Sequence, residues 1–391
     1  MAETRLFSEA CQPQPQPTSH ACASEGVQTD KSRPVGPDGD APGTVIPKNG
    51  GRPQSPRPLA NPEQRVVAVT GARSFIGGEI IRRMEEERRY RKILAFDIKK
   101  PDFPLERTEF HKLDLTLPTA DSDLAAILRR ENADTFVHAA FLSRPTHATA
   151  WAHELEDIGT MHVLNACAEA RIGKLILAST TLVYGPIPTN PNFLTEKHEL
   201  KGQPRSRFIR DRIAAEQQVR RFGTENPDAV VTVLRSALTL GPTINNFVTD
   251  FFSWPAVPRI MGYDPLLQFL HEQDSVDALW LALERDFPGE FNIVGDGVLP
   301  YSTILAMMGK IPIPIPHFLA YPVAGALWKG QVLDSPPNLL DLLRFLCVAD
   351  GAKASKIMGF RPRYNIKETI HDFLGVSQRG ETTLATSFDK A

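Results

Sequence analysis

The stretch T-G-A-R-S-F-I-G, residues 70–77, decides the fold of this chain. It follows a short apolar run, VVAVT (66–70), and leads into a run with helical periodicity, IGGEIIRRM (76–84). A glycine at the strand end permits a tight turn, and a glycine at the end of the stretch lets the helix pack closely on the strand. The helix N-terminus then presents free N–H groups, which suit a pyrophosphate. The stretch therefore predicts a strand–turn–helix unit that binds the phosphates of a dinucleotide.

An acidic residue in the expected place supports this prediction. Asp97 ends the second apolar run, 20 residues past Gly77. At that distance a carboxylate accepts hydrogen bonds from the adenosine ribose of NAD. The same carboxylate would repel the 2'-phosphate of NADP, so we predict NAD as the cofactor. Arg73, Lys99 and Lys100 lie nearby in the sequence and keep NADP open as the less favoured alternative.

Short aliphatic runs alternate with helical patterns from this unit to about residue 240. Such an order predicts a parallel sheet with helices on both faces, a doubly wound α/β fold of Rossmann type. Beyond it, stretches interrupted by proline and glycine predict a smaller, loop-rich and partly helical C-terminal part. We expect a NAD-binding domain at 65–240, a substrate or lid part at 241–376 with returns to the Rossmann core, and a flexible tail at 377–391.

The N-terminal segment has a different composition. Residues 1–64 hold 11 of the 33 prolines and few aliphatic residues, so we expect a disordered tail. The segment has neither the basic start nor the apolar core of a secretory signal, which predicts a cytoplasmic protein.

Charge and cysteine content exclude further classes of protein. With 44 basic and 46 acidic residues, the net charge of -2 provides no field of one sign, so nucleic acid is not expected as a partner. Cys11 and Cys22 lie in the tail, whereas Cys167 and Cys347 lie in apolar runs without paired spacing. We therefore predict no disulfide and no metal site.

Residues 311–328 form a run of 18 residues without a formal charge. That length is near the lower limit for a membrane span, but four prolines in the run oppose a spanning helix. Exposed apolar patches of this size mark a protein partner, a lipid or an apolar substrate. We expect a lid or a protein contact here, and a peripheral membrane anchor remains the alternative.

Together the motifs resemble the extended short-chain dehydrogenase/reductases, also called the NAD-dependent epimerase/dehydratase family. The resemblance runs from about Arg65 to Gly297 and returns at 356–375. The family's turn T-G-A-x-G-F-I-G matches 70–77, with Ser74 where a glycine is usual; its hydroxyl can itself donate to a phosphate. The resemblance implies cofactor contacts from Gly71, Arg73, Ser74, Phe75, Ile76, Gly77, Asp97, Asp114, Leu115, His138, Ala139, Ala140 and Arg212.

The family's catalytic pair is altered in this chain. Its members use a tyrosine as proton donor or acceptor and a lysine four residues later, and the matching stretch here is FIRDR, 208–212. Arg212 stays cationic and can hydrogen-bond a ribose. Phe208 cannot transfer a proton, a step that contributes ~100- to 10,000-fold to the rate. Thr180, in LASTTLVYG (177–185), matches the position of the family's catalytic hydroxyl.

Substitute acids come from the loops around the predicted ligand crevice. His147 follows the fourth strand and is the main candidate, and Glu196 and His198 follow the fifth. Ordinary solvated loop roles stay open for all three. Asp211 is interpreted as a helix N-terminal residue that complements the helix dipole.

Two functions remain open at this point. The first is an oxidoreductase or isomerase that acts on a hydroxyl or keto group of a sugar nucleotide or sterol-like small molecule with a non-standard proton donor. The second is a catalytically silent NAD(H)-binding sensor or scaffold, a pseudoenzyme. The resemblance also allows a homodimer through helices at roughly 153–171 and 207–222.

Overall fold

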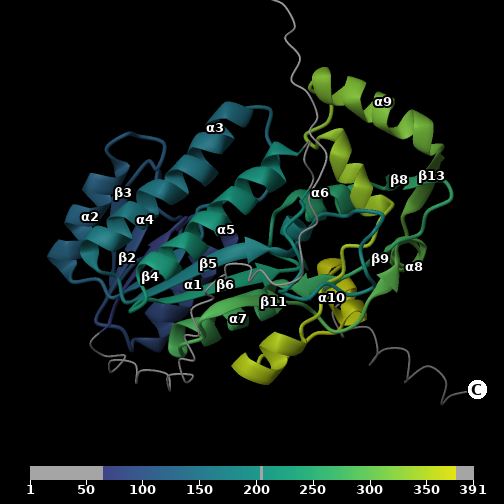
Figure 1. The fold of residues 1–391 in the computed structure, drawn as a ribbon. Coiled ribbons are helices and arrows are strands. Elements are labelled where there is room, and N and C mark those ends of the chain that lie inside the picture. The colour runs from purple at the N-terminus through teal and green to yellow at the C-terminus, as the bar shows by residue number, and fades with distance from the viewer. Residues whose placement is uncertain (1–64, 203–205, 376–391) are drawn as a thin grey trace, which may run out of the picture. The chain divides into compact units, whose positions relative to one another are not determined.

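The computed structural model describes residues 65–202 and 206–375, so the predicted tails at 1–64 and 377–391 lie outside the described residues. A seven-stranded sheet in the order β11-β6-β5-β4-β1-β2-β3 forms its centre (Figure 1). Every neighbouring pair in it is parallel. The strands are β1 (Val66–Thr70), β2 (Lys92–Asp97), β3 (Thr108–Lys112), β4 (Thr135–His138), β5 (Lys174–Thr180), β6 (Val230–Ser236) and β11 (Gly289–Ile293). The predicted doubly wound fold is confirmed.

Helices cover both faces of the sheet. Because side chains alternate along a strand, Val67 and Val69 of β1 join one core cluster and Val66 and Ala68 join the other. The helices of the first face are α1 (Phe75–Glu87) and α7 (Glu272–Glu284). The helices of the second face are α2 (Ala120–Glu131), α4 (Gly159–Ala170) and α5 (Arg207–Glu225).

The strand order reverses between β1 and β4, which places a crevice at their carboxyl ends. β1 pairs with β2 on one side and with β4 on the other, and the chain builds outward from there in both directions. Ligands of open α/β sheets bind at such a reversal. The turn at 70–77 follows β1 directly, so it lies at this crevice.

Short helical elements lie in the segments that follow β4 and β5. They are α3 (Thr149–His153), the π-helical turn η2 (Glu154–Ile158) that runs on into α4, and the 3-10 turn η3 (Thr181–Tyr184). The helix expected at roughly 153–171 therefore contains one wide turn before α4.

Most of the chain after residue 237, apart from α7 and β11, forms a smaller region with its own apolar cluster. It contains three two-stranded sheets, β10-β7, β12-β9 and β13-β8. Their strands are β7 (Leu238–Leu240), β8 (Ala256–Ile260), β9 (Leu266–Leu267), β10 (Phe269–His271), β12 (Leu299–Pro300) and β13 (Ile311–Ile315). The helices are α6 (Phe247–Ser253), α8 (Tyr301–Met307), α9 (His317–Lys329), α10 (Ile366–Phe373) and the short turns η4 (Pro337–Leu343) and η5 (Ala354–Met358).

The uncharged run at 311–328 forms β13 and α9. Pro312 and Pro314 lie in β13, which is paired with β8 alone, and Pro322 lies inside α9. Within residues 65–202 and 206–375, no helix has both the length and the apolar character that crossing a membrane requires.

Candidate active site

The turn between β1 and α1 has the tight geometry that its glycines predict. Gly71 has a φ of 71°, and a Cβ there would lie 2.4 Å from the carbonyl oxygen of Ala139. A Cβ at Gly77 would lie 2.2 Å from the carbonyl oxygen of Gly71. Neither position accepts a larger residue without a shift of the backbone. The turn therefore holds the start of α1 against the ends of β1 and β4.

Ser74 serves as the N-cap of α1. Its Oγ accepts a hydrogen bond from the Gly77 N–H at 3.1 Å and donates one to the carbonyl of Gly71 at 2.7 Å. In this structure the hydroxyl proton is used inside the turn, because an N-cap oxygen faces the helix backbone, and the expected contact of Ser74 with a phosphate stays a prediction. The first-turn N–H groups that lack intrahelical acceptors, including those of Phe75 and Ile76, remain the donors suited to a phosphate.

Asp97 lies at the end of β2, beside the turn. Its carboxylate accepts the N–H of Arg73 at 2.9 Å and that of Ile98 at 2.8 Å. A carboxylate has room for about four hydrogen bonds, so capacity remains for ribose hydroxyls. The Arg73 guanidinium turns away to Asp102, with an N–O distance of 3.0 Å. The carboxylate of Asp97 thus lies beside the turn, and the guanidinium of Arg73 is already paired with Asp102.

Asp114, one of the two residues implied at the adenine, is engaged locally. Its carboxylate accepts the N–H and the hydroxyl of Thr116, at 3.0 and 2.7 Å. Its neighbour Leu115 is buried in the core beneath β3. The predicted contact of both residues with adenine stays a prediction.

His138, at the end of β4, is a core residue. Its ring nitrogens lie 2.8 Å from the hydroxyl of Thr70 and 3.0 Å from that of Thr160, and the side chain is fully buried. Burial lowers the pKa of His138 to about 3. Only the backbone at this strand end is left to meet a cofactor, and the next residue, Ala139, lines the cavity described below.

A cavity of about 180 Å³ opens at the carboxyl edge of the sheet. Its walls include three of the four predicted catalytic positions, Thr180, Phe208 and Arg212. The Thr180 hydroxyl accepts the N–H of Leu182 at 3.3 Å, as an N-cap of η3. The Phe208 ring meets Phe247 edge-on, with 6.2 Å between centroids. The structure thus brings together residues that lie far apart in the chain.

Arg212 is held by a partner that the sequence did not reveal. Its guanidinium donates to the carbonyl of Leu142 and to Oε1 of Glu156, the latter at 3.2 Å. It also lies over the rings of Phe208 and Phe141, 4.8 and 5.3 Å from their centroids. Glu156 lies in η2 and is 1% exposed. Burial raises the pKa of Glu156, and the charge of Arg212 opposes that shift.

No local signal distinguished Glu156 in the sequence. It stands in the run ELED together with Glu154 and Asp157, and each would suit an exposed helix. Its inward direction depends on the π-helical turn and on the packing of η2 against α5, which are tertiary features.

His147, the main candidate for a substitute acid, is engaged outside the cavity. Its ring stacks on Trp328 of α9 with 3.6 Å between centroids, and its Nε2 donates to the carbonyl of Leu333 at 3.0 Å. It is absent from the described residues that line the cavity. The loop after β4 reaches the crevice as expected, but the segment that follows α9 covers this side chain.

Glu196 and His198 also have structural partners. Glu196 accepts the N–H of Asn292 in β11 at 2.9 Å, and His198 Nδ1 accepts the N–H of Thr195 at 2.9 Å. Neither lines the cavity. The nearby Tyr184 is buried, and its hydroxyl donates to Asn292 at 2.7 Å; burial raises its pKa to about 12.

The cavity therefore contains few groups that can transfer a proton. Among its lining residues in the described part of the chain, none carries a carboxyl, an imidazole, a phenol, an amine or a thiol. Arg212 is the charged side chain of that set, and the polar remainder consists of serine and threonine hydroxyls and one asparagine.

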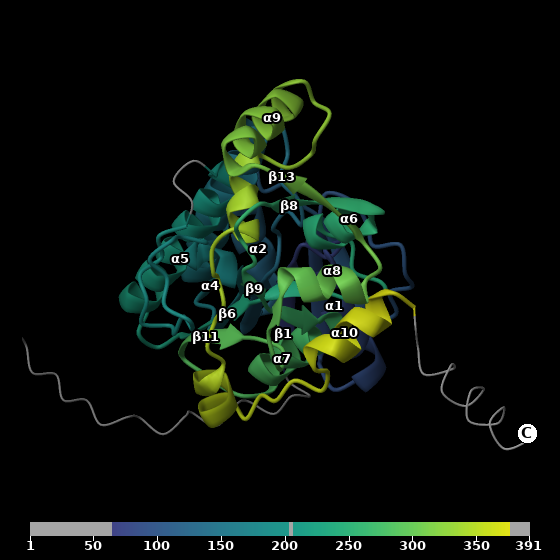
Figure 2. The same cartoon turned by 90° about the vertical axis from the view of Figure 1, so that its right-hand side faces the viewer.

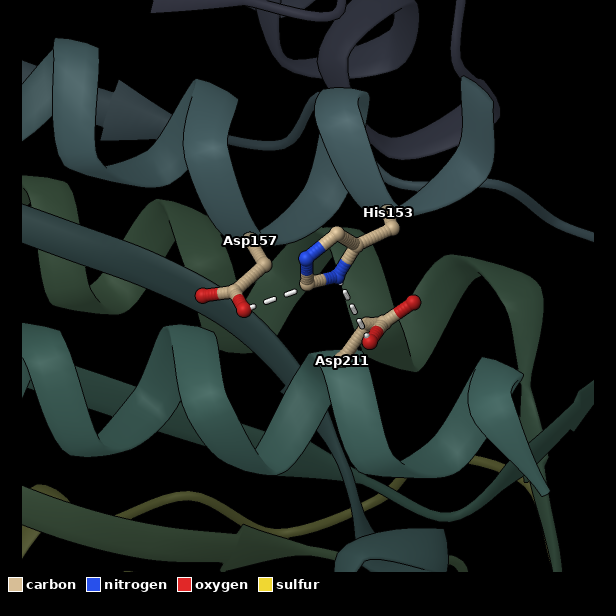
Figure 3. Close-up of side chains that lie close together, drawn as sticks. All are labelled: His153, Asp157 and Asp211. Carbon is tan, nitrogen blue, oxygen red and sulfur yellow. Dashed lines mark hydrogen bonds and ion pairs between the residues drawn. The ribbon is translucent and has the colours of Figure 1, made fainter. Parts of the chain in front are cut away.

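Asp211 belongs to a separate cluster, in which it lies opposite His153 and Asp157 of the neighbouring helical segment (Figure 3). His153 Nδ1 lies 3.1 Å from Asp211 and 3.6 Å from Asp157. Asp211 is buried and follows the first turn of α5, so its interpretation as a residue that complements the helix dipole is wrong. The three groups offer ligand atoms within 4.8 Å of one another. Their carboxylates also contact Gln218 and Arg207, so the cluster ties η2 to α5.

Comparison with known proteins agrees with this architecture. Residues 67–294 match the model of the NAD dependent epimerase/dehydratase family. An uncharacterized protein of Mycobacterium tuberculosis strain H37Rv is 31% identical over 316 residues, which cover 79% of this chain and 83% of that protein. A 4-hydroxy-2-methyl-3-oxo-4-farnesyl-3,4-dihydroquinoline-1-oxide ketoreductase of Stigmatella aurantiaca is 24% identical over 251 residues, covering 59% of this chain and 73% of that protein.

Solved structures share the fold at lower identity. A UDP-glucose 4-epimerase of Thermotoga maritima with UDP-glucose has a TM-score of 0.61 at 18% identity, covering 82% of this chain and 99% of that one. A UDP-glucose 4-epimerase of Thermus thermophilus in complex with NAD has a TM-score of 0.61 at 19% identity, covering 79% of this chain and 98% of that one. Since the family model spans more than half of the chain, the protein belongs to the NAD-dependent epimerase/dehydratase family, the extended short-chain dehydrogenase/reductases.

Proposed function

We propose that this protein binds NAD(H) at the crevice between β1 and β4 and works as a cofactor-binding module without the phenol-assisted proton transfer of its family. The observation that carries the proposal is the composition of the cavity. Arg212 lines the cavity and is paired with Glu156. Among the described residues that line the cavity, none carries a carboxyl, an imidazole or a phenol.

The residues around the turn fit a dinucleotide. The free N–H groups at the start of α1 suit the pyrophosphate, and Asp97 suits the adenosine ribose. A 2'-phosphate would meet the charge of Asp97, and Arg73 is already paired with Asp102. These contacts support NAD over NADP. A bound NAD(H) supplies or accepts a hydride, and the chain itself must handle the proton.

The side chains at the two expected catalytic positions are poor proton donors and acceptors. Phe208 has no ionisable group, and the guanidinium of Arg212 stays protonated under all ordinary conditions. A positioned acid or base is worth ~100- to 10,000-fold, so turnover through the usual route falls by at least that order. The hydroxyl of Thr180 remains, but it already accepts the N–H of Leu182.

A second candidate function is an oxidoreductase or isomerase that acts on a hydroxyl or keto group of a sugar nucleotide or sterol-like small molecule. The favouring observation is that Thr180 and Arg212 line the same cavity, where both can polarise a carbonyl while water supplies the proton. The ketoreductase of Stigmatella aurantiaca among the relatives supports a keto substrate.

The first experiment is a fluorescence titration of the purified full chain with NADH and with NADPH. We expect a saturable signal that is tighter for NADH. Asp97→Asn should narrow the difference between the two cofactors, because it removes the charge that a 2'-phosphate would meet. Absence of any saturable signal would contradict the proposal and the second candidate alike.

The second experiment separates the two candidates. Wild type, Phe208→Tyr and the double variant Phe208→Tyr/Arg212→Lys are assayed with NAD, UDP-glucose and a panel of secondary alcohols. Activity that arises only with the introduced tyrosine supports a silent module. Wild-type turnover that is lost in Thr180→Ala but kept in His147→Ala supports the second candidate, since Thr180 lines the cavity and His147 does not.

A further inference from the structure

The segment formed by β13 and α9 exposes large apolar side chains. Ile311 is 64% exposed and Ile313 47%, and on α9 the exposed fractions are 65% for Phe318 and 49% for Val323. Leu319, Val323 and Leu327 recur every fourth residue, so they share one face of the helix. We call these exposed side chains of 311–327 the β13–α9 surface. Figures 1 and 2 show α9 and β13 at the margin of the described fold, apart from the helices that cover the main sheet.

The opposite face of α9 already has its partner. Ala320 and Ala324 are buried, and α9 packs there against η4. A helix that is apolar all round is normally covered on all sides. Within the described part of the chain, no element covers the outer face of α9. Contiguous exposed apolar surface of this kind marks a binding site.

The edge of β13 opposes pairing with another protein strand. β13 pairs with β8 through one edge, and Met261 and Ile311 continue the hydrogen bonds at its two ends. Pro312 and Pro314 occupy the alternate positions, whose backbone would face the other edge, and proline has no N–H to donate. Strand addition by a partner, or by a second copy of this chain, is therefore disfavoured at this edge.

The surface also lacks the polar groups of a protein interface. Between Ile311 and Trp328 the polar side chains are those of His317, Tyr321 and Trp328. The Tyr321 hydroxyl is taken by Asp341 and Arg344, and the Trp328 ring stacks on His147. Protein interfaces carry about one hydrogen bond per 100–200 Å², which this surface cannot supply.

The charges around the surface suit an anionic bilayer. Lys310 and Lys329 bracket the uncharged run, and the next acidic residue, Asp334, comes five residues after Lys329. Basic residues beside an apolar surface attract anionic headgroups. Trp254, which is 53% exposed, precedes Pro255, whose carbonyl accepts the N–H of Ile311 at 3.0 Å. Tryptophan favours the membrane–water interface.

We propose that the β13–α9 surface docks this protein on the surface of an anionic lipid bilayer. α9 has 13 residues, too few to cross a bilayer, so it lies in the plane of the interface. Trp328, in the last turn of α9, also lines a recess next to Phe208. The docked surface thus adjoins the wall of the cavity. The proposal stands independently of catalytic turnover and of NAD(H) binding.

The test is co-sedimentation of the full chain with vesicles of phosphatidylcholine and phosphatidylserine in a roughly four-to-one ratio, and with pure phosphatidylcholine vesicles. We expect binding that is stronger on the anionic vesicles and weaker at high salt. Phe318→Ser/Leu319→Ser removes several inserted CH₂ groups and should weaken partitioning by more than about tenfold. Lys329→Gln should weaken it about fivefold on anionic vesicles and leave neutral vesicles unchanged.

Matched controls come from exposed apolar residues elsewhere. Trp151 and Met161 are 44% and 40% exposed on α3 and α4, and Trp151→Ser or Met161→Ser should bind vesicles like wild type. Circular dichroism verifies the fold of every variant. Equal vesicle binding by wild type and Phe318→Ser/Leu319→Ser, or no binding at all, overturns the proposal. If gel filtration shows a concentration-dependent dimer that only Phe318→Ser/Leu319→Ser loses, the β13–α9 surface is instead an interface with a second copy of this chain.

Discussion

Phe208 and Arg212, which the sequence predicts at the positions of the family's tyrosine and lysine, both line the cavity and have different surroundings there. Phe208 packs on Phe247 and serves as an apolar wall of the cavity. Arg212 has a wide planar cation that rests on two rings and pairs with Glu156, which a lysine could not match. We infer that the pair now contributes to structure and ligand binding rather than to proton transfer.

This inference predicts a large effect for Glu156→Gln. The change leaves the guanidinium of Arg212, whose side chain is 12% exposed, without the fully buried carboxylate of Glu156. Breaking a buried pair on one side costs about 3 kcal/mol or more. Urea unfolding should show that loss in the free energy of unfolding. Glu169→Gln is the control, because its pair with Arg129 is half exposed, and it should change stability by less than about 0.5 kcal/mol. Similar losses in both variants would refute the structural role of Glu156.

The start of α1 contains both a helix cap and the backbone N–H groups that suit a phosphate. Its N-cap Ser74 closes the turn through Gly71 and Gly77, and the first-turn N–H groups beyond it face the crevice. Because the cap uses the hydroxyl, the proposed binding of the NAD(H) phosphates relies on backbone groups. The side chain at position 74 acts by keeping those groups in place.

The cap predicts different results for two substitutions of Ser74. Ser74→Ala should lower the free energy of unfolding by about 1 kcal/mol and weaken NADH binding in a fluorescence titration, because the helix start loses its acceptor. Ser74→Gly, which restores the usual residue of the family turn, should cost only a few tenths of a kcal/mol. If alanine proves as stable as glycine, the cap contributes nothing.

The described core lies on both sides of a central sheet, and its most buried strands form the crevice. β1 is buried at all five positions, and β4 beside it is buried throughout. His138 ends β4 in this environment, with both ring nitrogens facing hydroxyls. The folded protein therefore holds a neutral imidazole at its centre, and its stability depends on pH.

The direction of that dependence follows from the lowered pKa of His138. An imidazole has a pKa near 6.5 in the unfolded chain and about 3 in the fold, so only the unfolded state gains a proton between these values. The contribution to stability is complete above about pH 6.5 and falls by about 1.4 kcal/mol per pH unit below it. We measure the free energy of unfolding in urea at pH 7, 6 and 5. Its fall per pH unit should be smaller by this amount in His138→Asn than in wild type. Equal pH dependence in wild type and His138→Asn would show that folding does not lower the pKa of His138.

Much of the architecture could be predicted because the buried parallel strands carry their own pattern. VVAVT and KILAFD coincide with β1 and β2, since strands covered on both faces must be apolar throughout. β11 was not predicted as a strand. It lies at the sheet edge beside β6 only, and its sequence GEFNI has few apolar residues to mark it.

The cofactor turn and the place of FIRDR were accessible from the sequence, because a turn and a helix start depend on neighbours in the chain. The partners of Arg212 and His147 were not. Glu156 reaches Arg212 across 56 residues, and Leu333 reaches His147 across 186. Contacts over such separations depend on how the helices pack. The local sequence around each residue allows its side chain to point in several directions.

The sequence alone thus determined the doubly wound fold and the family, since each depends on residue identity and local spacing. That Phe208 stands at the position of the family's tyrosine stays a prediction from the sequence. Only the tertiary structure decided that Ser74 caps α1, that His147 stacks on Trp328 and that Arg212 pairs with Glu156. It also decided that the apolar run at 311–328 faces outward. The physical reason is that burial and side-chain direction arise when distant segments pack together, and packing competes for the same polar groups that the sequence offers to a ligand.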